Sequence, residues 1–228
     1  MANLILINGK TGTGKSRAIK NLDPDKTYVI NVTGKDLPFP GARKMYNRER
    51  KNMNHITKWD KLVDTLNAIP KLRPEVNTII IDDARHIMEN EFIERATEVG
   101  YTKFTQLGQH MVQIFLAVKE IGNEDMDVFM MFHTDDIVNG TSITSVKAKL
   151  VGKLVEDHFD PYELATICLF TNTQYTEGKT TYRFITNLTN IDGITIPAKS
   201  PEGMFDLVIE NDLAIVKDKI HKYYKGEE

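Results

Sequence analysis

Four short runs of consecutive apolar residues recur along the first 132 positions of the chain. They lie at Leu4–Asn8, Tyr28–Val32, Thr78–Ile81 and Val128–Phe132, and none alternates between apolar and polar side chains. Such unbroken runs are typical of parallel strands that are covered on both faces. The pattern therefore predicts a buried, largely parallel sheet.

Segments with helical periodicity separate these runs. We expect a short helix from near Lys15 that stops by Pro24, and a second helix with apolar positions from Trp59 to Ile69 that Pro70 closes. Two more helices are expected between the last two strands. One covers Arg85–Val99, and the other carries an apolar stripe from Phe104 to Val118. Strands that alternate with helices in this way predict an α/β fold.

The remaining segments have weaker patterns. Thr33 to about Lys58 holds several helix breakers and is expected to be a long loop. Segments 166–174 and 180–187 flank a turn at residues 176–179 and predict a β-hairpin. Asn211 or Asp212 is expected to cap a final helix that carries Leu213, Val216 and Ile220. No linker is evident, so we expect one domain over residues 1–228.

Length and composition agree with a globular protein. The 228 residues carry a net charge of −3 and include one cysteine, Cys168, which excludes an internal disulfide and a cysteine-based zinc site. No apolar stretch is long enough for a membrane span, and the first apolar run is too short for a signal peptide. We expect a cytoplasmic protein without a membrane partner.

Charge is distributed unevenly along the chain. Basic residues dominate from Arg43 to Lys61, acidic residues from Glu120 to Asp136, and lysines alone carry charge from Thr141 to Lys153. Such runs are either solvated faces or local patches for an anionic partner.

The strongest chemical signal follows the first apolar run. The motif G-x-x-x-x-G-K-[ST] of a P-loop is matched by Gly9, Lys10, Thr11, Gly12, Thr13, Gly14, Lys15 and Ser16. Its glycines turn backbone N–H groups toward phosphate oxygens, the lysine lies between the β- and γ-phosphates, and the Ser16 hydroxyl completes a Mg²⁺ shell. We expect these eight residues and the adjacent Arg17 to bind ATP with Mg²⁺.

Two aspartates follow the third apolar run. Asp82 ends a strand at the edge of the sheet where ligands of open α/β sheets bind, so it is expected to hold Mg²⁺. Asp83 is a candidate for orienting the attacking water. The alternative is that these aspartates cap the next helix, an interpretation that suits Asp83 better than Asp82.

His133 ends the fourth apolar run. A polar residue in this place could contact the γ-phosphate and report hydrolysis to the segment that follows. The alternative is a histidine whose hydrogen bonds are satisfied within the core.

With these three motifs in this order, the chain resembles RecA-core P-loop ATPases. More narrowly, it resembles bacteriophage ATP-binding proteins of the AAA-domain or Sak-type single-strand annealing family. The closer likeness lies in four stretches, Leu37–Gly41, Tyr101–Thr105, Gly152–Leu154 and Ala198–Phe205. It implies a three-layer αβα P-loop NTPase with a RecA-like sheet, plus a C-terminal β-hairpin and helix.

The resemblance also implies a function and partners. These are ATP hydrolysis coupled to single-stranded DNA in phage recombination or replication, contacts with other phage proteins of these processes, a homo-oligomer, and the cytoplasm of a bacterial host. It matches Lys15 and Ser16 to the nucleotide and Mg²⁺ residues, Asp82 to the Walker B acid and His133 to the sensor, so Lys15, His133 and, by its own position, Asp83 are the candidate catalytic residues. It also makes the segment Thr134–Lys153 a mobile DNA-binding loop. In that segment Lys147, Lys149 and Lys153 would contact DNA phosphates, or the first two would reach a neighbour's γ-phosphate in trans.

One departure leaves turnover open. RecA-like ATPases commonly carry a catalytic glutamate at the end of the second strand, whereas this chain has Asn31-Val32-Thr33 there. Three interpretations are open. Either Asp83 takes the role of the glutamate, or hydrolysis is slow, or the protein is a nucleotide-gated switch or loader. A small-molecule kinase is a further alternative, although no arginine for a lid follows the fourth strand until Arg183.

Overall fold

A computed structural model describes residues 1–227, except for the side chain of Leu154. Its main sheet has eight strands in the order β12-β9-β8-β1-β5-β4-β2-β3. The strands are β1 (Asn3–Asn8), β2 (Thr27–Asn31), β3 (Met53–His55), β4 (Thr78–Asp82), β5 (Asp127–Phe132), β8 (Ile167–Thr176), β9 (Lys179–Ile185) and β12 (Val208–Glu210). All pairings from β8 to β3 are parallel, and β9 and β12 are antiparallel additions at one edge.

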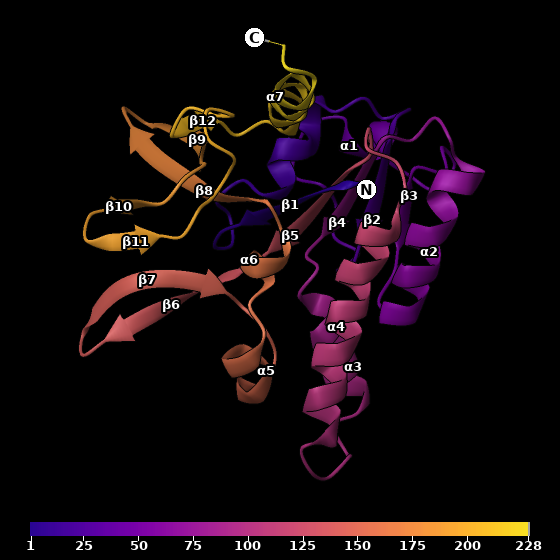
Figure 1. Ribbon diagram of the computed structural model, residues 1–228, viewed down its shortest axis with the longest axis vertical. Helices are drawn as coiled ribbons and strands as arrows, with labels where there is room; N and C mark the ends of the chain where they lie inside the picture. Colours follow the sequence, from indigo (N-terminus) through magenta and orange to yellow (C-terminus); the bar gives the residue numbers. More distant parts are fainter. Residues whose placement is uncertain (228) are drawn as a thin grey trace.

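Helices cover both faces of this sheet, which confirms the predicted three-layer α/β architecture (Figure 1). One face packs against α2 (Trp59–Leu72), α3 (His86–Glu94) and α4 (Thr102–Glu120). The other packs against the short helix η1 (Ser16–Asn21) and α7 (Leu213–Lys225). Successive strand residues alternate between the two cores, since Leu4 and Leu6 enter one and Ile5 and Ile7 the other. Burial on both faces explains why these strands are apolar throughout.

The C-terminal part agrees with its prediction. β8 and β9 form an antiparallel hairpin around Glu177-Gly178, and Asp212 caps α7 by accepting a hydrogen bond from the backbone N–H of Ala214. Without such a cap, the first N–H groups of a helix lack partners.

Two helix boundaries differ from the prediction. Pro70 lies inside the last turn of α2, which continues through Leu72. A proline removes one helical hydrogen bond and its ring crowds the carbonyl four residues earlier, and the helix ends two residues after it. The third predicted helix ends at Glu94 rather than Val99, and the next begins at Thr102. Arg95 bonds to Glu91, Glu98 and Gln106, and it fixes the connection between these helices.

The segment Thr33–Lys58 is not a featureless loop. It contains the one-turn helix α1 (Ala42–Met45) and the edge strand β3, which pairs with β2 in parallel. The sequence of β3 has no apolar run, because an edge strand of three residues is only partly buried.

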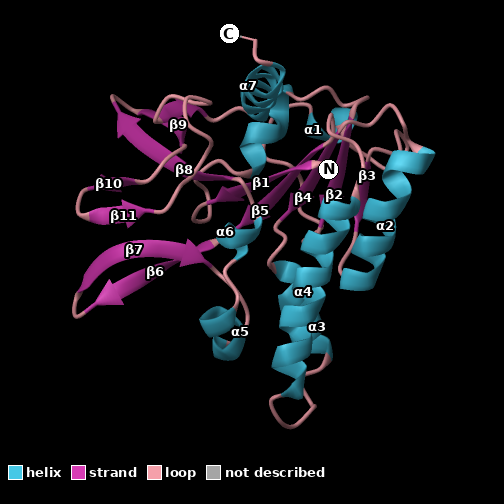
Figure 2. Ribbon diagram, viewed as in Figure 1, coloured by secondary structure: helices cyan, strands magenta, loops and turns pink. Residues whose placement is uncertain are grey.

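The segment Thr134–Lys153 contradicts its prediction as a mobile loop. It forms a hairpin of β6 (Thr134–Asn139) and β7 (Ser142–Ala148), which joins β10 (Thr189–Ile191) and β11 (Ile194–Ile196) in a second sheet of four strands. The short helices α5 (Lys153–His158) and α6 (Pro161–Leu164) lead from it to β8. Figure 2 shows this second sheet beside the β8–β9 hairpin, on the opposite side of the molecule from α2. Gly140 and Thr141 make the two-residue hairpin turn, and Gly140 has a φ of +63°, so the glycine at the first turn position was a signal that the sequence did contain.

Among the described residues, no helix combines the length and apolar character that crossing a membrane requires.

Candidate functional site

The predicted P-loop connects β1 to η1 at the carboxyl edge of the parallel strands. Gly12 and Gly14 have φ angles of +79° and +101°, a backbone conformation that side chains disfavour. A Cβ on Gly14 would also lie 2.7 Å from the Tyr182 ring. The loop is anchored at both ends, because Gly9 N–H donates to the carbonyl of Phe132 and the Thr13 hydroxyl donates to the carbonyl of Lys10. The loop geometry therefore depends on its glycines.

The helix that follows the P-loop is shorter and tighter than expected. η1 is a 3₁₀ helix of six residues, and its N-terminal dipole is correspondingly small. A positive environment at this loop must therefore come mainly from backbone N–H groups and from Lys15.

Lys15 is buried at the centre of the site, with 5% of its surface exposed. Its ammonium donates to the carbonyls of Gly9 and Lys10 at 2.8 and 3.0 Å, so its hydrogen bonds to the loop go to uncharged oxygens. Burial lowers the pKa of Lys15 to about 8, and the negative charges of Asp83 and Asp82 act in the opposite direction. A buried ammonium of this kind is stabilised when an anion binds beside it.

Ser16 and Asp82 are brought together as predicted for a metal site. The Ser16 hydroxyl donates to Asp82 Oδ1 at 2.8 Å, although 66 residues separate the two in sequence. Burial, and then the charge of Asp83, raise the pKa of Asp82 to about 6. Two buried neighbouring carboxylates and a hydroxyl are oxygen donors of the type that Mg²⁺ prefers.

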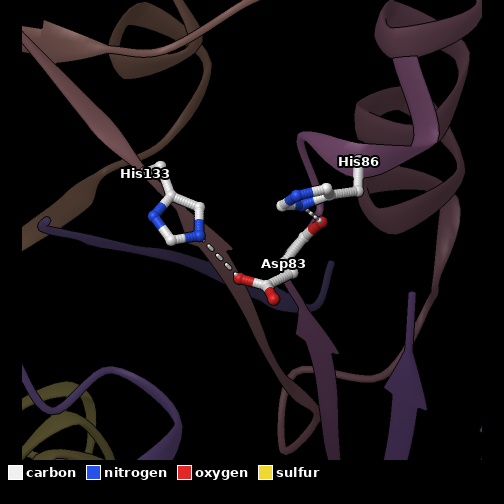
Figure 3. Close-up of side chains that lie close together, drawn as sticks. All are labelled: Asp83, His86 and His133. Carbon is white, nitrogen blue, oxygen red and sulfur yellow. Dashed lines mark hydrogen bonds and ion pairs between the residues drawn. The ribbon is translucent and has the colours of Figure 1, made fainter. Parts of the chain in front are cut away.

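Asp83 and His133 form a hydrogen-bonded pair across neighbouring strands. His133 Nε2 donates to Asp83 Oδ1 at 3.0 Å (Figure 3). Lys15 Nζ lies 3.4 Å from His133 Nδ1. Asp83 has a φ of +59°, which turns its carboxylate away from the direction of β4. Burial by itself raises the pKa of Asp83, but the His133 hydrogen bond and charge outweigh it and bring the pKa to about 2. Asp83 is therefore an ionised hydrogen-bond acceptor.

His86 was not predicted to belong to the site. Its Nδ1 lies 3.3 Å from the backbone carbonyl oxygen of Asp83, and its ring meets the His133 ring edge to face (Figure 3). Asp83, His86 and His133 each offer one potential metal-ligating atom, and these atoms lie within 4.8 Å of one another. The hydrogen bonds already described account for this arrangement, and the Lys15 ammonium beside His133 opposes a cation there. Ser16 and Asp82 therefore stay the residues that we expect to hold Mg²⁺.

All of these groups line one cavity of about 830 Å³. Its walls include most of the predicted nucleotide-binding residues, namely Lys10, Thr11, Gly12, Gly14, Lys15, Ser16 and Arg17, together with Asp82, Asp83 and His133. Gly9 and Thr13 instead line a smaller cavity behind the loop. The larger volume is in the range that small-molecule sites occupy.

The three lysines predicted to contact DNA lie in different surroundings. Lys149 lines the large cavity and pairs with Asp135 at 2.8 Å, whereas Lys147 pairs with Glu156 on α5 at 2.8 Å. Lys153 is exposed at the start of α5. Two of the three lysines are thus held by carboxylates.

Sequence reasoning missed several residues of this site. Asp136 of β6 pairs with the predicted Lys10 at 2.9 Å and so contacts the P-loop, and the Thr33 hydroxyl donates to Asp83 Oδ2 at 3.2 Å. Tyr182 reaches the cavity from β9. Asn211 lies behind Gly14 with a buried carboxamide that has no hydrogen-bond partner. Of these contacts, only the one made by Asp136 had a signal in the sequence, because Asp136 lies in the acidic run from Glu120 to Asp136.

Comparisons with known proteins give limited information. No protein-family profile matches the chain, and no curated protein matches it. The structure is similar to that of a KaiC-like protein from the hyperthermophilic archaeon Pyrococcus horikoshii OT3, with 11% identity over 80% of this chain and 77% of that chain and a TM-score of 0.46. It is also similar to the flagellar accessory protein FlaH from Methanocaldococcus jannaschii, with 15% identity over 80% and 76% of the two chains and a TM-score of 0.41. At such low TM-scores these similarities say nothing about activity, so the chemistry must be inferred from the residues of the site.

Proposed function

We propose that this protein binds ATP with Mg²⁺ and hydrolyses it. The observation that carries the proposal is the buried Lys15 ammonium, whose hydrogen bonds to the P-loop go only to carbonyl oxygens, in a cavity that also holds Ser16, Asp82, Asp83 and His133. A triphosphate would supply the anion that this ammonium lacks, and charge-assisted contacts of this type are strong.

The P-loop N–H groups fit a triphosphate, and the side-chain oxygens beside them fit Mg²⁺. Gly12 has a positive φ and open space where a Cβ would lie, so phosphate oxygens can approach the backbone N–H groups there. Ser16 and Asp82 would hold Mg²⁺ through one hydroxyl and one carboxylate, and a cation there would relieve the repulsion that raises the pKa of Asp82. When bound, the metal neutralises charge on the transferred phosphoryl group.

The roles of the remaining residues follow from their positions. Lys15 stabilises charge on the phosphate oxygens, and Asp83 accepts a hydrogen bond from the attacking water and so orients it toward the γ-phosphorus. The P–O bond to the leaving β-phosphate oxygen breaks as the new P–O bond forms. Phosphoryl transfer through a loose transition state needs positioning more than proton abstraction, so a weakly basic Asp83 suits this role. His133 holds Asp83 in place and joins it to Lys15.

We further propose that hydrolysis is coupled to single-stranded DNA in a bacteriophage recombination or replication process, with the protein acting as a homo-oligomer. The support is the likeness in sequence motifs, together with basic residues at two surfaces. Lys153 is exposed beside the second sheet, and the run from Arg43 to Lys61 keeps Lys44, Arg48 and Lys51 exposed. Hydroxyl-bearing and basic side chains contact phosphates without reading base sequence.

A nucleotide-gated switch is the second candidate. It is favoured by the ion pair between Lys10 of the P-loop and Asp136 of β6, because a bound phosphate would compete with Asp136 for the Lys10 ammonium. Occupancy of the site would then be transmitted to the β6–β7 hairpin without turnover.

Phosphate release separates these functions. We would measure inorganic phosphate released from Mg·ATP with and without single-stranded DNA, with Lys15→Ala as the inactive control. Stimulation by DNA supports the recombination role, and tight binding without release supports the switch. DNA binding is measured by fluorescence anisotropy across a salt series, since contacts to single-strand phosphates give a log–log slope of about −0.7 each. Absence of ATP binding to the wild type would refute both candidates.

A further inference from the structure

The large cavity has one aromatic wall. Among the described residues that line it, Tyr182 is the only phenylalanine, tyrosine or tryptophan, and charged or small polar residues form most of the rest. The polar and charged residues can bind a triphosphate, whereas a nucleobase stacks on a flat surface such as an aromatic ring. The cavity volume of about 830 Å³ leaves room for more than a polyphosphate chain.

Tyr182 is held in a defined position. It lies on β9, where it pairs with Thr173 of β8, and its carbonyl accepts a hydrogen bond from the N–H of Asn211. The ring packs against the P-loop at Gly14, where even one added methyl group would collide with it. A ring fixed by strand pairing on one side and by the P-loop on the other is a preorganised surface.

Arg17 completes a stack on this ring. Its guanidinium carbon lies 4.6 Å from the Tyr182 ring centroid, in the geometry of a cation–π contact. A guanidinium is planar and also stacks on nucleobases, so a guanidinium held against this ring offers its outer face to a base.

The position of this pair along the cavity is also informative. Arg17 follows Lys15 by two residues and lies beyond Ser16, whereas Asp83 and His133 contact each other near the Lys15 ammonium. If the γ-phosphate lies at Asp83 and His133, the nucleoside must extend toward the opposite end of the P-loop. That end carries Arg17 and Tyr182.

We propose that Arg17 and Tyr182 form the nucleobase subsite, so that the ligand of this cavity is a nucleoside triphosphate rather than an inorganic polyphosphate. The inference rests on the proposed binding of a triphosphate at the P-loop and deepens it. The base stacks on the outer face of the Arg17 guanidinium, whose inner face lies on the Tyr182 ring, and the phosphates lie along Gly12–Ser16.

The test compares two ligands that share the phosphate chain. Calorimetry with Mg·ATP and with Mg·tripolyphosphate is run on the wild type, Tyr182→Ala and Tyr182→Phe. Loss of one stacking contact lowers affinity by roughly tenfold. We therefore expect Tyr182→Ala to weaken ATP binding by about tenfold and to leave tripolyphosphate affinity within about twofold of the wild-type value. Tyr182→Phe keeps the ring and should bind ATP as the wild type does.

A second readout does not depend on the alanine variant. The chain has one tryptophan, Trp59, which stacks on His110 beside α4. In a Trp59→Phe background, Tyr182→Trp places the single indole in the subsite. Mg·ATP should quench its emission, and Mg·tripolyphosphate should not, because only ATP brings a base to the ring.

The outcomes separate this inference from the function on which it rests. If Tyr182→Ala lowers the affinity for ATP and for tripolyphosphate equally, or lowers neither, the nucleobase subsite is overturned. The wild type would still bind triphosphates in that case. Equal quenching by ATP and tripolyphosphate would overturn the subsite as well. If the wild type binds neither ligand, the proposed function itself fails.

Discussion

His133 Nε2 lies 3.0 Å from Asp83 Oδ1, and this hydrogen bond joins the ends of two neighbouring parallel strands, β4 and β5. The other ring nitrogen of His133 faces Lys15 of the P-loop at 3.4 Å. One imidazole thus connects the phosphate-binding loop with the carboxylate that would orient water. This arrangement gives both predicted residues a structural basis for acting together.

The two adjacent aspartates should separate in their effects. Asp82→Asn is expected to weaken Mg²⁺-dependent ATP binding by tenfold or more, because it removes a carboxylate next to the Ser16 hydroxyl. Asp83→Asn should leave affinity nearly unchanged and lower kcat by about 100-fold, since it removes an acceptor for the attacking water. Calorimetry with and without Mg²⁺, together with single-turnover phosphate release, measures both. Equal losses of affinity in the two variants would refute this division of roles.

Lys15→Ala should abolish ATP binding without loss of the fold. Its ammonium bonds only to loop carbonyls and a histidine, so its removal leaves the surrounding apolar core intact. The expected loss is about 2–4 kcal/mol of phosphate binding free energy. Lys20→Ala, on the short helix that follows Lys15 but outside the large cavity, is the matched control. Calorimetry and thermal unfolding monitor binding and fold, and unchanged ATP affinity in Lys15→Ala would overturn the P-loop assignment.

Lys147 on β7 and Lys149, which follows the end of that strand, form a matched pair. Lys149 lines the large cavity, and its loss also leaves Asp135 without its ion-pair partner there, so Lys149→Ala should weaken ATP binding. Lys147→Ala should not, because its ammonium pairs with Glu156 on α5. If Lys147 contacts single-stranded DNA, its removal should reduce the log–log salt slope by about 0.7. Equal ATP affinities in the two variants would argue against a role for Lys149 in the nucleotide site.

A pH-dependent contribution to stability is expected far from the site. His221 Nε2 on α7 donates to the fully buried Asp127 at 2.7 Å, and Lys217 Nζ lies 3.6 Å from the same oxygen. This hydrogen bond raises the pKa of His221 above its usual value of about 6.5. The protonated histidine therefore stabilises the fold fully below about pH 6.5, and this stabilisation is lost as the pH rises through the raised folded-state pKa.

Urea unfolding at a series of pH values tests this expectation. The difference in unfolding free energy between the wild type and His221→Gln should be largest at acidic pH and shrink as the pH rises. His158→Gln, at an exposed histidine, is the control and should show no such trend. A difference that is constant with pH would show that His221 contributes packing rather than charge.

The sequence alone predicted the parallel strands, most of the helices and the P-loop. Local physics suffices for these features, because a strand buried on both faces must be apolar and a phosphate loop needs glycines at particular positions. The same reasoning failed for the segment Thr134–Lys153, whose strands are partly exposed and so lack an apolar run. Gly140, at the first position of its two-residue turn, was the one local signal.

Only the tertiary structure decided which of the predicted site residues contact one another. Asp83 and His133 are 50 residues apart, and Ser16 and Asp82 are 66 apart, so their hydrogen bonds depend on strand order rather than on local pattern. Tyr182 is a still clearer case. It lies on a strand whose sequence carries no chemical motif, and it reaches the P-loop because β9 follows β8 at the edge beside β1. Residues distant in sequence become neighbours through the sheet topology, which no short sequence motif encodes.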